Sequence, residues 1–100
     1  MTAAALTPAV ALAWLGSLSI DVRAAAVLDS GGAVLAGDAA LGARAAAALA
    51  AAPGAGELSD GDLLIVRSGR HAVAASLGPH ALRRVARSDL RAAAQALDGR

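Results

Sequence analysis

The sequence predicts a chain of the α/β class (α+β), with a mainly antiparallel five-stranded sheet covered by helices on both faces. Residues 23–52 show this best, because two strands joined by Asp29-Ser30-Gly31-Gly32 are followed by an alanine-rich helix. Both strands are apolar on both faces, whereas a hairpin with one face in water alternates apolar and polar residues. Helices must therefore cover both sides of the sheet. The expected order is helix, strand, strand, helix, strand, strand, strand, helix.

The composition indicates one small globular domain over residues 1–100, with a core built from small aliphatic side chains. Hydrophobic residues make up 57% of the chain, and Trp14 is the only aromatic side chain. Such a core favours stabilisation by oligomerisation. The net charge of +1 gives no indication of a nucleic acid or a membrane as partner. The lack of cysteine fits a cytoplasmic location, and residues 2–20 lack the basic start of a signal peptide.

Thr7 and Pro8 mark the start of the first helix, because a hydroxyl cap precedes a residue that needs no N–H donor. The helix is expected to run to about Leu18, with Trp14 on its apolar ridge. In the hairpin that follows, Gly31-Gly32 is a turn and not a phosphate loop. The Lys-Ser/Thr pair of such a loop is missing, and the segment leads into a strand.

The alanine-rich helix begins at Asp38, whose carboxylate can accept hydrogen bonds from the free N–H groups of the first turn. Its larger apolar residues share one face: Leu41, Ala45, Ala48, Leu49 and Ala52. Small residues at four-residue spacing line another face, where a second backbone can approach closely: Gly42, Ala46 and Ala50. Pro53-Gly54 ends the helix, and residues 57–61 are expected to form a polar connector.

The C-terminal half is predicted to contain three strands and a helix. Residues 62–67 include a continuous apolar run, which indicates a strand buried on both faces. Ser68-Gly69 is the expected turn into a strand over residues 70–77, and residues 81–87 are expected to form a weaker fifth strand. Ser88 is the expected cap of the last helix, with Gly99 after its end.

Three helices must cover the two faces of this five-stranded sheet. Two helices can share one face, which leaves the alanine-rich helix alone on the other. One helix covers about 10 Å of sheet width, whereas five strands about 4.8 Å apart span roughly twice that. The uncovered part of the sheet and the nearly uncharged back of this helix therefore predict a dimer surface.

In the order of its elements the chain resembles the Roadblock/dynein light chain family of the profilin-like fold group. The resemblance is carried by the hairpin from Ala25 to Ala36, by strands 63–66 and 72–77, and by Ser88-Asp89-Leu90. It covers residues 10–97. Family members form homodimers or heterodimers, in which sheets join edge to edge and middle helices pack together. Bacterial members are similar to small proteins that act on Ras-like GTPases, and other members are scaffolds.

The resemblance implies a non-enzymatic dimeric scaffold or regulatory partner module, with a small Ras-like GTPase as a partner. Leu63–Arg67 would be the joining edge and Leu41–Leu49 the paired helix. The implied dimer interface comprises Leu41, Gly42, Ala45, Ala46, Leu49, Leu63, Ile65 and Arg67. The alternative is a small-ligand sensor of PAS-like or GAF-like type, although few polar or aromatic residues are present to orient a ligand.

Five arginines lie between residues 63 and 88, a stretch without any acidic residue: Arg67, Arg70, Arg83, Arg84 and Arg87. On adjacent strands they can gather into a basic patch for phosphate or an acidic partner surface. Arg70, Arg83, Arg84 and Arg87 are therefore the candidate partner-binding residues. The alternative is a set of charges at strand ends and sheet edges that discourages aggregation. Nucleic-acid binding is not expected, because aromatic stacking platforms are lacking.

No cluster of residues in the sequence predicts a reaction or a cofactor. His71 and His80 are the only histidines, and no further ligands accompany them at the spacing of a metal site. No serine has a base arranged around it at a recognisable spacing. We therefore expect no enzyme activity, no catalytic or metal-binding residue and no cofactor.

Overall fold

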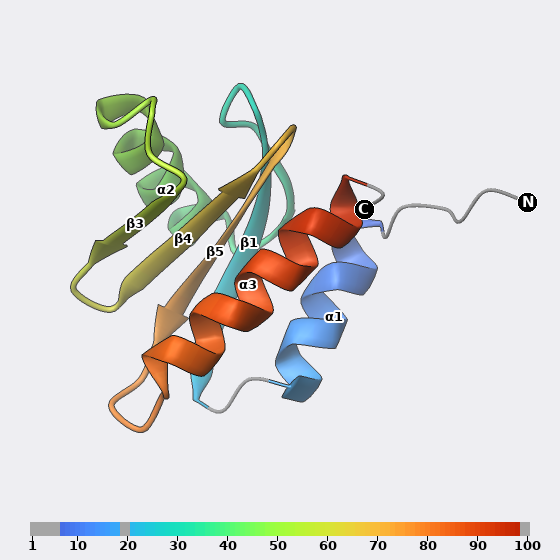
Figure 1. Cartoon of the computed structure of the whole chain (residues 1–100), viewed down its shortest axis with the longest axis vertical. Coiled ribbons are helices and arrows are strands. Elements are labelled where there is room, and N and C mark those ends of the chain that lie inside the picture. Colours follow the sequence, from blue (N-terminus) through green and yellow to red (C-terminus); the bar gives the residue numbers. More distant parts are fainter. Residues whose placement is uncertain (1–6, 19–20, 99–100) are drawn as a thin grey trace, which may run out of the picture.

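The structure of the protein is a computed structural model that describes residues 7–18 and 21–98. Its helices are α1 (Pro8–Leu18), α2 (Ala39–Ala51) and α3 (Arg83–Leu97). Its strands are β1 (Val22–Asp29), β2 (Val34–Gly37), β3 (Glu57–Asp60), β4 (Leu63–Ser68) and β5 (His71–Leu77) (Figure 1). The predicted fold class and the predicted order α-β-β-α-β-β-β-α are confirmed.

The five strands form one sheet in the order β2-β1-β5-β4-β3, and all neighbouring strands are antiparallel. The chain leaves the first hairpin at the β2 edge, and α2 carries it to the β3 edge. The first hairpin and the meander of β3, β4 and β5 therefore meet at one seam. At this seam Val22 of β1 lies opposite Leu77 of β5, and Asp29 lies opposite His71.

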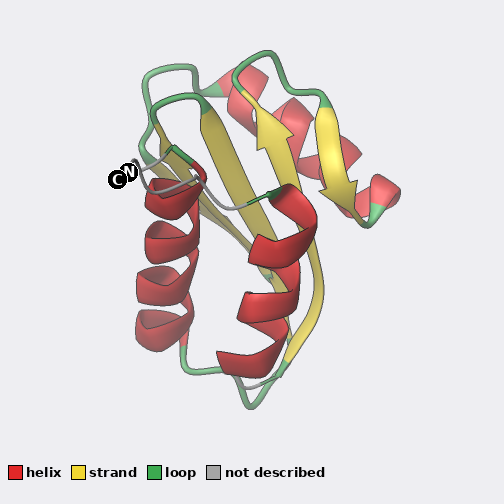
Figure 2. Cartoon of the chain, turned by 90° about the vertical axis from the view of Figure 1, so that its right-hand side faces the viewer, coloured by secondary structure: helices red, strands yellow, loops and turns green. Residues whose placement is uncertain are grey.

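Helices α1 and α3 cover one face of the sheet, and α2 lies alone on the other face, as predicted (Figure 2). Neighbouring residues of one strand point into different layers. Val27 and Val73 pack under α1 and α3, whereas Leu28 and Ala72 face α2. All four side chains are 2% exposed or less. The central strands are apolar on both faces because each face has its own core.

Two aspartates shape the first hairpin and the start of α2. Asp29 Oδ1 accepts hydrogen bonds from the N–H groups of Gly31 and Ala33, each at 2.9 Å. Gly32 has a φ of 89°, which favours glycine in the turn. Asp38 is the N-cap of α2, as predicted, and its Oδ1 lies 2.8 Å from a first-turn N–H group. The aspartates thus end the hairpin turn and begin the helix.

The segment 57–61 is not the polar connector that we expected. Its residues Glu57–Asp60 form β3, the outermost strand, in which Leu58 lies opposite Ile65 of β4. Leu58 is the strand's only apolar residue, and it packs against the core under α2. A strand of four residues with one apolar side chain carries too little periodicity to be told from a loop.

Residues 81–87 are not a strand, and Ser88 is not a helix cap. α3 begins at Arg83, and its N-cap Leu82 makes no side-chain hydrogen bond. Buried residues recur with helical spacing on both sides of Ser88: Ala86, Leu90, Ala93, Ala94 and Leu97. Ser88 is exposed within the helix. The two errors compensate in the strand count, since β3 takes the place of the strand expected at 81–87.

The C-terminal end of α3 is tied to the β4–β5 turn. Gly69 and Arg70 form this turn, one residue later than expected. Asp98 Oδ1 lies 3.2 Å from the backbone N of Arg70 and 2.6 Å from Nδ1 of His71. Burial would raise the pKa of Asp98, but the hydrogen bonds from His71 and Arg70 outweigh it and hold the pKa below its usual range. The expected stop at Gly99 lies outside the described residues.

Asp98→Asn is expected to make the free energy of unfolding depend less on pH between neutral pH and about pH 3. A carboxylate with a lowered pKa in the folded chain stabilises the fold above its unfolded pKa of about 3.9. That contribution is lost as the pH falls through the folded value. Urea unfolding from neutral pH to about pH 3 measures it, and the unfolding free energy of the variant should fall less than that of the wild type. Equal slopes would show that the Asp98 contacts do not stabilise the fold.

Candidate interaction surface

Helix α2 presents its larger residues to the sheet and its small ones to the outside. Leu41, Ala45 and Leu49 are buried in the core between α2 and the sheet. The exposed residues, which we call the alanine face, are Ala39, Ala40, Ala43, Ala47, Ala50 and Ala51. Arg44 is the one charged residue of α2, and its guanidinium lies 3.1 Å from the carboxylate of Asp62. The outer face of α2 is therefore almost entirely methyl groups.

The predicted interface residues of α2 and β4 lie inside the chain's own fold. Leu63 and Ile65 are 2% and 1% exposed and belong to the same core as Leu41, Ala45 and Leu49. A Cβ at Gly42 would overlap the side chain of Val34, and Ala46 lies against the β1–β2 turn. The close approach expected at these two small residues is therefore made by the chain's own hairpin.

The strand expected as the joining edge is not an edge strand. β4 lies between β5 and β3, so the free edges of the sheet are β2 and β3. The backbone N–H of Arg67 donates to Gly56 O at 2.8 Å. Because hydrogen-bonded pairs alternate along antiparallel strands, Glu57 and Ser59 direct their backbone N–H and C=O groups away from β4. At the other edge, a register shift interrupts the β1–β2 pairing and makes β2 a poorer template.

The candidate basic patch is divided between the two ends of α3. Arg70 lies in the β4–β5 turn beside the C-terminal end of the helix. Arg83, Arg84 and Arg87 lie in its first two turns. A helix of 15 residues is about 22 Å long, so Arg70 does not share a patch with these three. Arg67 lies on the α2 face of the sheet.

Arginines of α3 reach across the sheet to β3. Nη1 of Arg83 donates to Oγ of Ser59 at 2.9 Å, and Nε of Arg87 lies 3.0 Å from Oε2 of Glu57. Arg91, which the sequence analysis did not include, pairs with the same carboxylate. Its spacing of four residues from Arg87 would have pointed to it, had residues 81–87 been read as helical. We call Arg83, Arg84, Arg87 and Arg91 the arginine row.

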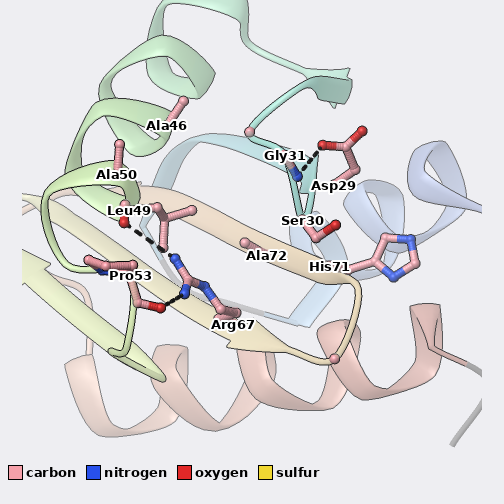
Figure 3. A pocket seen from close by; sticks show the side chains of 12 residues that line it. Asp29, Ser30, Gly31, Ala46, Leu49, Ala50, Pro53, Arg67, His71 and Ala72 are labelled. Carbon is pink, nitrogen blue, oxygen red and sulfur yellow. Dashed lines mark hydrogen bonds between the residues drawn. The ribbon is translucent and has the colours of Figure 1, made fainter.

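A pocket of about 380 Å³ lies between the second half of α2, the β1–β2 turn and the β4–β5 turn (Figure 3). Arg67 contributes the cation in its wall, and its guanidinium donates to the backbone oxygens of Leu49, at 3.5 Å, and of Pro53. These bonds satisfy carbonyl groups at the end of α2. Asp29 is engaged with the hairpin turn, and the ring of His71 points away from Arg67. Asp29 and Arg67, the charged residues of the pocket, thus make hydrogen bonds within the fold.

The two histidines lie at opposite ends of β5. His71 contacts Asp98, and the backbone N–H of His80 donates to Oδ2 of Asp21 at 2.9 Å. Within residues 7–18 and 21–98, no group of three or more His, Cys, Asp or Glu side chains is placed to hold a metal ion. None of the helices in these ranges has the length and apolar character needed to cross a membrane.

The sequence matches no protein-family model and no curated protein. The structure is similar to solved structures. It aligns with "MglB with tetrameric arrangement" at a TM-score of 0.72 and 19% identity, over 97% of this chain and 91% of that one. A Roadblock/LC7 domain from Streptomyces avermitilis aligns at 0.66 and 14%, over 95% and 96% of the two chains. MglC from Myxococcus xanthus aligns at 0.63 and 14%, over 92% and 97%. The chain therefore has the Roadblock fold, as its sequence predicts.

Proposed function

We propose that the chain is a non-enzymatic module that works as a homodimer, as a scaffold or regulatory partner of the Roadblock type. The observation that carries the proposal is the free backbone edge of β3, on a molecule whose α2 exposes a face of alanine. The family resemblance supports this combination, because sheets join edge to edge and middle helices pack together in its dimers. The strand that we propose joins the two sheets is β3, because β4 lies inside the sheet.

The edge of β3 allows a two-fold strand pairing centred on Leu58. In antiparallel pairing about this residue, Glu57 of each copy lies opposite Ser59 of the other. The backbone groups of these two residues point outward, so the junction would form four hydrogen bonds. Leu58 packs on the core under α2 and would meet its counterpart across the axis. The two sheets would then become one continuous sheet.

The alanine face provides the second part of the proposed interface. Helix α2 packs mainly on β1, β2 and β5, and its Arg44 reaches Asp62 in the β3–β4 turn, so one flank of the helix is turned toward the proposed junction. Ala40, Ala47 and Ala51 lie toward the β3 side of α2, because they flank Arg44 on the helix. Their methyl groups permit a close approach of two helix backbones and bury no polar group. Joining the two copies would also cover part of the alanine face.

Ala47→Glu is expected to weaken the dimer by about tenfold or more, because it brings two carboxylates into the helix contact. Sedimentation velocity over a micromolar concentration series measures the dissociation constant. Ala13→Glu is the matched control, since Ala13 is an exposed alanine of α1 on the opposite face of the sheet. A wild-type chain that is monomeric at micromolar concentration would contradict the proposed dimer. Equal effects of the two substitutions would contradict the helix contact.

A small Ras-like GTPase is the partner that we propose for this dimer, on the basis of the family resemblance. The test uses the small GTPase encoded nearest to the gene of this chain. Co-elution of the two proteins in size-exclusion chromatography, with a changed rate of GTP hydrolysis, would support a regulatory role. Co-elution without a changed rate would support a scaffold. Separate elution in both nucleotide states would contradict this choice of partner.

The pocket beside Arg67 gives a specific reason to test the alternative of a small-ligand sensor. Its volume of about 380 Å³ falls within the range of small-molecule sites. We prefer the dimeric module, because Arg67 and Asp29 are already engaged in internal hydrogen bonds. Native mass spectrometry separates the two proposals. A retained small molecule would support the sensor, and the mass of two unliganded chains would support the dimeric module.

A further inference from the structure

We propose that the arginine row binds an acidic helical segment of a partner protein, one segment per dimer. The proposal deepens the proposed function and rests on the dimer described above. The arginine row contacts the proposed dimer edge directly. Arg83 bonds to Ser59 of β3, and Arg87 and Arg91 pair with Glu57 of the same strand.

The arginine row carries more positive charge than its surroundings balance. At about 100° per residue, its four side chains occupy an arc of about 100° on α3, on the flank toward β3. Arg87 and Arg91 share the single carboxylate of Glu57. Arg83 bonds to the neutral oxygens of Ser59 and Gly61, and Arg84 is exposed. Four guanidinium groups thus face one carboxylate.

This charge is concentrated on one part of the molecule. The whole chain carries a net charge of only +1, so the remainder outside the row and Glu57 is net negative. Asp89 belongs to the same helix but lies on the opposite flank, about 160° from Arg87. The side chains of Arg87 and Arg91 are 44% and 51% exposed, so a partner can reach them. An acidic ligand would meet an attractive field at this flank.

The sheet beside the row is open to a ligand of helix width. Helix α3 packs on β4 and β5 and does not cover β3 (Figure 1). The stems of the arginines extend over this part of the sheet. In the proposed dimer, four strands separate the two α3 helices: β4 and β3 of one copy, and then β3 and β4 of the other. Four strand spacings of about 4.8 Å place the two helix axes about 19 Å apart.

A gap of this width fits one further helix. Packed helices lie about 8–10 Å apart, so a helix on the two-fold axis would contact both α3 helices. Both arginine rows would face it, and guanidinium groups pair bidentately with carboxylates. A nucleic acid is a poorer fit, because single strands bind on aromatic side chains and the chain has only Trp14, on α1. The geometry therefore favours an acidic helix.

Fluorescence anisotropy with a labelled peptide tests the proposal. The probe is an alanine-based helical peptide of about 18 residues with glutamate at every fifth position, which avoids like charges at i,i+4 and presents carboxylates to both arginine rows. A peptide with lysine at those positions is the control. We expect binding of one glutamate peptide per two chains, weakening as NaCl is added. Arg84→Glu should weaken binding about tenfold, because both copies of the charge are reversed. Arg84 has an exposed side chain and is a safe site for folding.

Arg23→Glu is the matched variant, since it makes the same charge change at an exposed arginine of β1. An equal loss of affinity in both variants would show that net charge alone attracts the peptide, and would overturn the proposal. Tighter binding of a short DNA duplex of equal charge would also overturn it. Light scattering on the same samples gives the mass of the chain in solution. A dimer that does not bind the peptide would contradict peptide binding by the arginine row, and a monomer would contradict the proposed dimer as well.

Discussion

Ser59→Pro is expected to leave the chain folded and to reduce its mass in solution from that of a dimer to the 9.6 kDa of one chain. The backbone N–H of Ser59 points away from β4, so proline removes no bond within the chain's own sheet. In the proposed junction it removes one donor from each copy and places a ring between the strands. The dissociation constant should rise by at least about 100-fold, as measured by sedimentation equilibrium.

Ser59→Ala is the control for this substitution. It removes the hydroxyl that accepts a hydrogen bond from Arg83 but keeps the backbone N–H. We expect this variant to remain a dimer. Circular dichroism shows whether both variants keep their strands and helices. A folded Ser59→Pro chain that still dimerises would place the junction elsewhere, with the β2 edge as the next candidate.

Ile65→Ala is expected to lower the free energy of unfolding by about 2–5 kcal/mol, because it opens a cavity in a packed core. Ile65 is 1% exposed and packs with Leu41, Leu49 and Leu63 between the sheet and α2. A domain of this size has about 5–15 kcal/mol of stability, so the loss is a large fraction of the total. Urea unfolding at a fixed protein concentration measures it. The variant that remains folded should keep the mass of the dimer.

Leu35→Ala is the matched control on the same sheet. Leu35 is 44% exposed at the β2 edge, so its truncation should change the unfolding free energy by only about 0.5 kcal/mol. If Ile65→Ala instead left the stability unchanged and dissociated the dimer, Ile65 would be an interface residue, as the family resemblance implies. The two outcomes separate a core role from an interface role for β4.

The fold was predictable where each element carries its own signal. Thr7-Pro8 and Asp38 begin helices by satisfying free N–H groups, and the two-faced apolar strand β1 requires a layer on each side. The same expectation was wrong for β2, whose Val34 and Leu35 are 40% and 44% exposed at the sheet edge. The signal failed at β3, which is short and polar, because its pairing depends on β4. It also failed at 81–87, where Leu82, Val85 and Ala86 read as an apolar strand. The helical spacing of Ala86 and Leu90 was present in the sequence, but reading Ser88 as a helix cap separated the two residues.

The candidate interaction surface was harder to predict, because alanine occurs both in the buried face and in the exposed face of α2. The leucines of α2 fix which side faces the sheet, but Ala45 is buried and Ala47 is exposed with the same side chain. The edge of the sheet depends on strand order, which local sequence does not encode. β4 lies between β5 and β3, and its apolar run Leu63–Val66 is buried, but β2 is also apolar and is an edge strand. Arg91 was missed because residues 81–87 were read as a strand and because its partner Glu57 was read as part of a loop.

The seam between β1 and β5 also determines how the chain must fold. It joins residues more than forty positions apart, whereas the first hairpin and the later meander are closed by short turns. Loop-closure entropy makes such a distant pairing the slow step, so the two halves can assemble before they meet. During synthesis β1 stays without its central neighbour until β5 has left the ribosome. The nascent chain therefore carries an apolar strand with one unpaired edge, which is open to aggregation until residues 71–77 are available.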